Sequence, residues 1–140
     1  MIVGGEIGLL DTSALVALLS QDDEGHEAVV EYLQAFRGRL MTTEAVLTEG
    51  LHLLRPFHGG ADACLTFFLR GAAVLVPSTI DSLRRCRDIM VRYSDLPADY
   101  ADATLIALSE EVGSRTVVTL DRRDFSVYRD RAGKSFEIRP

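Results

Sequence analysis

Cysteine is scarce in this chain, and its scarcity excludes two kinds of structure. The two cysteines, Cys64 and Cys86, both lie in apolar helical patterns, and neither belongs to a Cys-x-x-Cys or Cys/His cluster. The sequence therefore favours neither a zinc site nor a disulfide framework. We expect both thiols to be buried small hydrophobic groups in a reducing cytoplasm.

Long apolar runs are also missing. No segment approaches the roughly 18 consecutive apolar residues that a membrane-spanning helix needs. The first residues, Met1–Glu6, lack the basic and apolar regions of a secretory leader. A length of 140 residues with 47% hydrophobic composition predicts a single domain, residues 1–140, with a substantial core.

Lysine is nearly absent, since Lys134 is the only lysine beside 14 arginines. The net charge of −6 argues against nonspecific binding of nucleic acid over the whole surface. Arginine is the better bidentate phosphate ligand, so a local basic face remains open. Genome composition would produce the same bias, and the charge alone therefore leaves the substrate class undecided.

Strand and helix patterns alternate along the whole chain. We expect short strands at residues 7–10, 40–41, 73–77, 116–120 and 136–138. Helices are expected at residues 12–19, from Asp22 to Phe36, at 44–54, at 61–70, around 83–93, and from near Pro97 to Gly113. Thr12 or Ser13, and Thr42 or Thr43, are the expected N-caps. The alternation predicts a three-layer α/β/α fold around a mostly parallel sheet.

Acidic residues follow two of these strands. Asp11 ends the first strand and Asp121 ends the strand at 116–120. In an open α/β sheet, ligands bind in the crevice outside the carboxyl ends of the strands. Asp102 interrupts an apolar helical segment, where an ionised carboxylate must be paired, hydrogen-bonded or metal-bound. Converging acids without an evident basic partner predict a divalent cation held by oxygen ligands.

Each acid alone also fits a simpler role. Asp11 fits an N-cap, and Asp121 fits the start of a turn that brings Asp124 back towards it. Glu44 and Glu49 share one helix but face different directions, so spacing does not choose between them.

Four segments together resemble the PIN-domain nucleases, and within them the VapC-type toxins of toxin–antitoxin pairs. The matching segments are Leu9–Leu15, Thr43–Glu49, Asp99–Ala103 and Val118–Phe125, in the family's order. The resemblance implies a PIN-like fold with catalytic, metal-binding acids at Asp11, Glu49, Asp102 and Asp121. Accessory or orienting roles are expected for Thr12, Ser13, Asp99, Thr119 and Asp124.

The resemblance also implies an activity and partners. It predicts an endoribonuclease that uses Mg²⁺, or Mn²⁺, to hydrolyse RNA phosphodiester bonds. It further implies a homodimer and a small antitoxin protein. Arg122 and Arg123, beside Asp121, are the expected substrate contacts, and the arginines of one helix are weaker candidates: Arg84, Arg85, Arg87 and Arg92.

Other functions could use the same acids. A noncatalytic PIN-like module that binds RNA or protein would carry the same acids without turnover. A phosphatase with Asp11 as nucleophile fits poorly, because the haloacid-dehalogenase pattern needs an acid where Ser13 stands. A receiver domain would need a lysine late in the sheet, and Lys134 follows the last helix.

Overall fold

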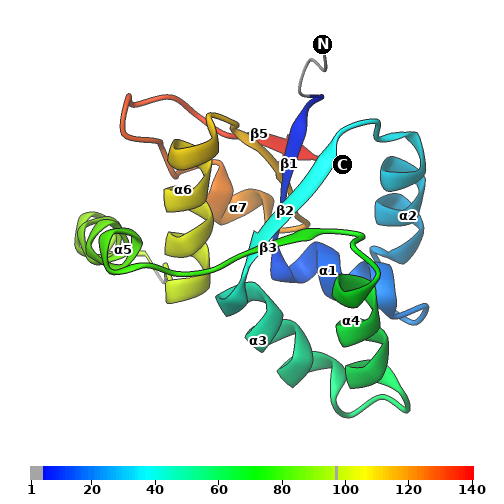
Figure 1. Cartoon of the computed structure of the whole chain (residues 1–140). Helices are drawn as coiled ribbons and strands as arrows, with labels where there is room; N and C mark the ends of the chain where they lie inside the picture. The colour runs from blue at the N-terminus through cyan, green and yellow to red at the C-terminus, as the bar shows by residue number, and fades with distance from the viewer. Residues whose placement is uncertain (1–4, 97) are drawn as a thin grey trace.

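A five-stranded sheet forms the centre of the molecule in a computed structural model that describes residues 5–96 and 98–140 (Figure 1). The strands are β1 (Ile7–Leu10), β2 (Arg39–Thr43), β3 (Val74–Val76), β4 (Thr116–Val118) and β5 (Glu137–Arg139). Their order is β3-β2-β1-β4-β5, and every pairing between them is parallel. The expected α/β architecture is confirmed.

Helices cover both faces of this sheet (Figure 1). They are α1 (Thr12–Leu19), α2 (His26–Ala35), α3 (Glu44–Leu54), α4 (Gly60–Leu69), α5 (Ile80–Arg92), α6 (Tyr100–Val112) and α7 (Arg122–Phe125). Helices α1 to α4 pack together on one side, and α6 and α7 lie on the other, with α5 packed outside α6. None of the described helices has the length and apolar character to cross a membrane.

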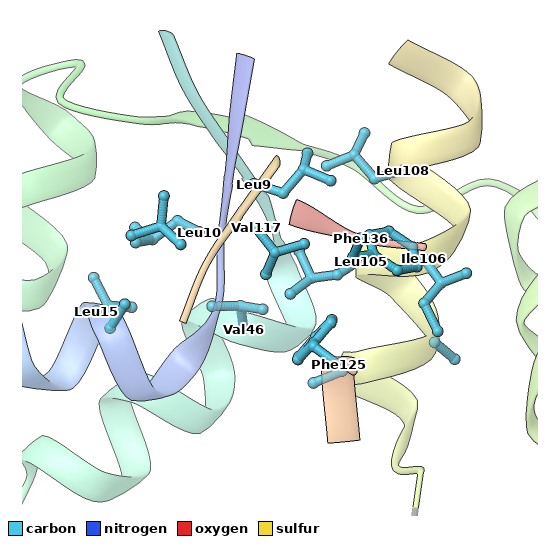
Figure 2. Close-up of a cluster of buried hydrophobic side chains, with 14 of the residues drawn as sticks. Leu9, Leu10, Leu15, Val46, Leu105, Ile106, Leu108, Val117, Phe125 and Phe136 are labelled. Atoms are coloured by element: carbon cyan, nitrogen blue, oxygen red, sulfur yellow. The ribbon is translucent and has the colours of Figure 1, made fainter. Parts of the chain in front are cut away.

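The core lies on both faces of the central strands, as strand geometry requires. Successive side chains of β1 point to opposite faces, so Leu9 faces α6 while Leu10 faces α1 (Figure 2). Leu105 lies on the same side of the sheet as Leu9, and Leu15 on the same side as Leu10; all four side chains are fully buried. This packing holds the carboxyl end of β1 in place between α1 and α6.

The connectivity creates a switch point in the strand order beside β1. The chain passes from β1 to β2 and β3 on one side of the sheet, then returns through α5 and α6 to β4 on the other side. Leu10 pairs with Val118, so the residues after β1 and β4 emerge next to each other. Such a switch point is where parallel α/β sheets bind ligands.

Some expected boundaries and caps are wrong. Helix α2 begins at His26 rather than at Asp22, because the Asp23 carboxylate accepts the Gly25 N–H at 2.8 Å and forms a local turn. The last two strands are shorter than, or shifted from, the expected 116–120 and 136–138. Pro97, expected near the start of α6, lies outside the described residues, as do residues 1–4.

The threonines and the serine expected to cap helices bond elsewhere. Thr12 and Ser13 are already inside α1, whose N-cap is Asp11. Thr43 is the N-cap of α3 by position, yet its hydroxyl bonds with that of Thr104 at 2.7 Å. The Thr42 hydroxyl donates to the Leu10 carbonyl at 2.6 Å. These hydroxyls therefore join elements that are distant in the sequence.

Candidate active site

Asp11 is held at the junction of β1 and β4 by two hydroxyl groups. Its side chain is only 5% exposed, and its Oδ2 accepts from Thr119 at 2.7 Å and from Ser13 at 3.3 Å. Burial raises the pKa of Asp11, and the hydrogen bond from Thr119 opposes that rise. The hydroxyls thus favour the carboxylate form and orient it.

The same hydroxyls fix the loop that carries Asp121. The Leu120 N–H donates to Ser13 Oγ at 3.0 Å, and the Asp121 N–H donates to Thr119 Oγ1 at 2.9 Å. Asp121 is the N-cap of α7, where its Oδ1 accepts the Asp124 N–H at 3.1 Å. The turn role and the place in the acidic cluster therefore coexist in this residue.

Asp102 enters the cluster from the first turn of α6 and is 9% exposed. Asp99 caps this helix by accepting the Asp102 N–H at 2.9 Å. Burial, followed by the charges of Asp99 and Asp11, raises the pKa of Asp102 to about 8. A carboxyl with this pKa retains a proton near neutral pH until a cation replaces it.

Tyr128 is a site residue that the sequence analysis missed. Its side chain is fully buried, and its hydroxyl donates to Asp102 Oδ2 at 2.8 Å. Its ring packs edge-on against Phe125 and Tyr93. Burial and the bond to Asp102 raise the pKa of Tyr128, so the phenol stays a donor. The available signal was weak: one tyrosine following Phe125 in an aspartate-rich segment.

Three carboxylates form the tightest acidic group among the described residues. One oxygen from each of Asp102, Asp121 and Asp124 lies within 4.8 Å of the other two. Burial and the charge of Asp121 raise the pKa of Asp124. Asp124, for which an accessory role is expected, therefore lies in the same acidic group as Asp102 and Asp121. Clustered carboxylate oxygens suit a hard divalent cation.

Glu49 lies at the α3 side of the site. The Thr12 hydroxyl donates to Glu49 Oε1 at 2.9 Å. Burial raises the pKa of Glu49, and the carboxylate of Asp99 raises it further. Both Glu44 and Glu49 line a pocket of about 460 Å³ with Asp99 and Tyr100. The contact with Thr12, directly after Asp11, links Glu49 to the acidic cluster.

The candidate arginines separate into different environments. Arg122 and Arg123 are exposed on α7, and Arg122 donates to the Pro140 carbonyl. The positive charge of Arg123 opposes the pKa rise of Asp124, so it acts on the acidic group. Arg85 does not fit a substrate contact, because it forms a paired hydrogen bond with Glu110 at 2.6 and 2.8 Å.

Comparisons with known proteins agree with this geometry. The PIN domain family model matches residues 8–130. The chain is 31% identical over 135 residues to Ribonuclease VapC26 of Mycobacterium tuberculosis (strain ATCC 25618 / H37Rv), covering 94% of this chain and 99% of that protein.

Solved structures share the fold. The crystal structure of Mycobacterium tuberculosis VapC20, a sarcin-ricin loop cleaving toxin, matches with a TM-score of 0.81 and 25% identity, over 96% of this chain and 100% of that one. VapBC2 from Rickettsia felis, bound to a promoter DNA fragment, matches with a TM-score of 0.68 and 14% identity, over 96% and 99% of the two chains. The second match supports the fold alone. By its sequence and its fold, this chain belongs to the PIN-domain family.

Proposed function

We propose that this chain is a divalent-metal-dependent endoribonuclease, the toxin of a toxin–antitoxin pair, built as one PIN-like domain over residues 1–140. The observation that carries the proposal is the group of Asp102, Asp121 and Asp124, in which one oxygen of each residue lies within 4.8 Å of the others. The relatives named as a ribonuclease and as a sarcin-ricin loop cleaving toxin support RNA as the substrate.

The donor set fits Mg²⁺ or Mn²⁺. Asp11, Glu49, Asp102 and Asp121 would hold the metal, with Asp124 adjoining them, and all of these residues offer carboxylate oxygens. No ion pair links any of these carboxylates to an arginine or lysine in residues 5–96 and 98–140. When bound, the metal would lower the pKa of a water molecule and offset negative charge on the phosphodiester.

The protein's own contribution is to orient these carboxylates. Thr119 and Ser13 hold one oxygen of Asp11, and Tyr128 holds one oxygen of Asp102. Hydrogen bonds of this kind around ligating groups fix their orientation and tune their affinity. Arg123, beside the acidic group, is the arginine best placed to bind an RNA phosphate.

Family membership supports the proposed partners. We assign a small antitoxin protein as the inhibitor, because an arginine of such a partner would pair with these clustered carboxylates and compete with the metal. We also assign a homodimer and a cytoplasmic location, where the free, buried Cys64 and Cys86 stay reduced.

The test is RNA cleavage by Asp102→Asn during a Mg²⁺ titration. We expect cleavage to fall to background while the thermal unfolding temperature in EDTA does not decrease, because the amide keeps the size of the carboxyl but cannot ionise to bind the metal. Asp62→Asn, an exposed position on α4, is the matched control and should cleave like the original protein. Cleavage by folded Asp102→Asn at the original rate would refute the assignment. Metal binding without cleavage by the original protein would favour a noncatalytic module.

A further inference from the structure

The α3–α6 pocket lies between the first turns of two helices. It has a volume of about 460 Å³, and its walls include Glu44 and Glu49 of α3 with Asp99 and Tyr100 at the start of α6. Figure 1 shows the first turn of α6 beside that of α3, and the two helices contact each other. Glu49 is a proposed metal ligand, and Asp99 caps the helix that carries Asp102. The pocket therefore opens beside the acidic site.

The walls of this pocket do not suit a phosphate. None of the described residues that line it is an arginine or a lysine, and its acidic side chains repel negative charge. Ala45 and Ala101, whose side chains are single methyl groups, also line it. An RNA strand that crosses the acidic site would therefore put an uncharged base in the pocket and keep its backbone outside.

Tyr100 provides a surface on which a base can stack. It is 37% exposed, and it is the aromatic residue among the described residues of the pocket wall. Proteins that read RNA sequence bind unpaired bases by stacking them on aromatic rings and by hydrogen-bonding their edges. Stacking accepts every base, so the choice among bases falls to the polar groups of the wall.

Glu44 offers a pair of acceptors for the edge of that base. It is exposed, and it forms no ion pair within residues 5–96 and 98–140. The other two acids of the wall already accept hydrogen bonds, Glu49 from the Thr12 hydroxyl and Asp99 from the Asp102 N–H. An ionised carboxylate accepts through two oxygens and donates nothing. Its best partner is therefore a base edge with two adjacent donors.

Guanine is the RNA base with such an edge. Its Watson–Crick edge presents N1–H and N2–H side by side, whereas those of adenine, cytosine and uracil place an acceptor beside each donor. Two parallel N–H bonds to one carboxylate form the bidentate arrangement that arginine makes with a carboxylate.

We infer that the α3–α6 pocket binds an unpaired guanine next to the scissile phosphate, with its ring stacked on Tyr100 and its N1–H and N2–H donating to the Glu44 carboxylate. The inference rests on the proposed ribonuclease activity and adds the base that the site selects.

Cleavage of a single-stranded RNA pool with a randomised segment, followed by sequencing of the products, tests the selection. Guanine should be enriched at one fixed position relative to the cut. Inosine at that position lacks the 2-amino group and should lower kcat/KM by about 10-fold, because one of the two hydrogen bonds is lost. 7-Deazaguanine retains both donors and should be cleaved like guanine.

Variants of the two pocket residues assign the contacts. Glu44→Ala should reduce the guanine-to-inosine ratio of kcat/KM to about 2-fold or less. Glu27→Ala, an exposed glutamate in the first turn of α2, is the matched control and should keep the ratio. Tyr100→Ala should lower kcat/KM for the guanine RNA by about 10-fold, and Tyr100→Phe should not, because phenylalanine retains the stacking ring. A ratio that persists in Glu44→Ala would refute the assignment of Glu44.

The outcomes separate this inference from the ribonuclease itself. Cleavage without a preference for guanine would refute the pocket and leave the nuclease intact. The second measurement is fluorescence anisotropy of Asp102→Asn with labelled oligouridylate that carries a single guanine or a single inosine. Tighter binding of the guanine oligonucleotide, without cleavage of any RNA by the original protein, would support the pocket and refute the nuclease. Equal binding of the two oligonucleotides would refute the pocket whether or not the original protein cleaves.

Discussion

At the residue scale, the partners of the buried hydrogen bond between Tyr128 and Asp102 have different surroundings. The phenol is enclosed by Phe125 and Tyr93, whereas Asp102 faces the carboxylates of Asp121 and Asp124. The hydrogen bond therefore connects Asp102 to the aromatic core. The orientation of the Asp102 carboxyl depends on how the Tyr128 ring packs in that core.

Tyr128→Phe keeps the ring and removes this bond. We expect the apparent Mg²⁺ affinity to fall by about 10-fold, the lower end of what such supporting contacts provide. Calorimetric titration and the Mg²⁺ dependence of cleavage measure the change. Tyr32→Phe is the control, because Tyr32 stacks on Phe36 rather than on the acidic site. Equal Mg²⁺ affinity in Tyr128→Phe and the original protein would contradict the supporting role.

Arg123 provides a second prediction at this scale. Its exposed guanidinium acts on Asp124, so an RNA strand entering the site would meet it. Arg123→Ala, in an Asp102→Asn background that cannot cleave, should make the logarithm of RNA affinity less steeply dependent on salt, by about one unit of slope or less. Arg37→Ala, in the segment between α2 and β2, is the control. An unchanged slope would show that Arg123 does not contact phosphate.

At the scale of elements, a bidentate ion pair joins α5 and α6 in addition to their packing contacts. Arg85 and Glu110 bond through both carboxylate oxygens, and their side chains are 19% and 11% exposed. A partly buried bidentate pair of this kind is costly to break, because the remaining charge loses its partner without regaining full hydration.

Arg85→Ala should therefore lower the free energy of unfolding by about 2 kcal/mol. Denaturant titration measures this change. Arg139→Ala removes the exposed pair of Arg139 with Glu137 and should cost about 0.5 kcal/mol or less. Cleavage by Arg85→Ala, measured at a temperature where it is folded and at saturating RNA, should match that of the original protein. Equal stability losses in the two variants would contradict this ranking.

Sequence patterns predicted the elements better than the contacts between them. Alternating apolar residues were sufficient to predict the parallel sheet. The acids after two strands were sufficient to predict that Asp121 lies near enough for its charge to raise the pKa of Asp11. The bond from Tyr128 to Asp102 and the bond from Thr12 to Glu49 were not predictable. Both join residues far apart in the chain, so they depend on tertiary packing rather than on local spacing.

The Asp124 and Thr12 interpretations show the same limit. Local rules assigned Asp124 to a turn and Thr12 to a cap, and only the family resemblance gave both an accessory role at the site, because the local rules consider only neighbours in sequence. The structure puts Asp124 in the tightest acidic group and turns Thr12 toward Glu49. A residue at the end of a strand or helix can contact a second element as well as its own. Sequence patterns identify the element that contains the residue but not the second one.

At the scale of the whole molecule, the acidic site opposes folding of the metal-free protein. Burial raises the pKa of Asp102 from 3.8 to about 8, and burial also raises the pKa of Asp11 and of Glu49. Between these two pH values, the folded protein retains a proton on Asp102 that the unfolded chain has released. The contribution of Asp102 to the free energy of unfolding is therefore fully present below about pH 4 and is lost as the pH rises towards 8.

We expect the thermal unfolding temperature in EDTA to fall as pH rises from about 5 to about 8. Asp102→Asn should flatten this dependence and be the more stable protein at the upper end, because it carries no charge there. Asp62→Asn should retain the full slope, since that carboxyl is exposed. A slope of the opposite sign in the original protein would contradict the raised pKa of Asp102.

The position of β4 in the sheet has a consequence for synthesis of the protein. β4 lies between β1 and β5, yet it is translated after all three strands on the other side of the sheet have been made. A ribosome-bound chain that ends before Thr119 has made Asp11, Glu49 and Asp102, but it lacks Asp121 and the Thr119 hydroxyl, one of the two hydroxyls that bond to Asp11. Under the proposed function, a growing polypeptide therefore completes its acidic site only after its last segment has emerged and inserted into the sheet.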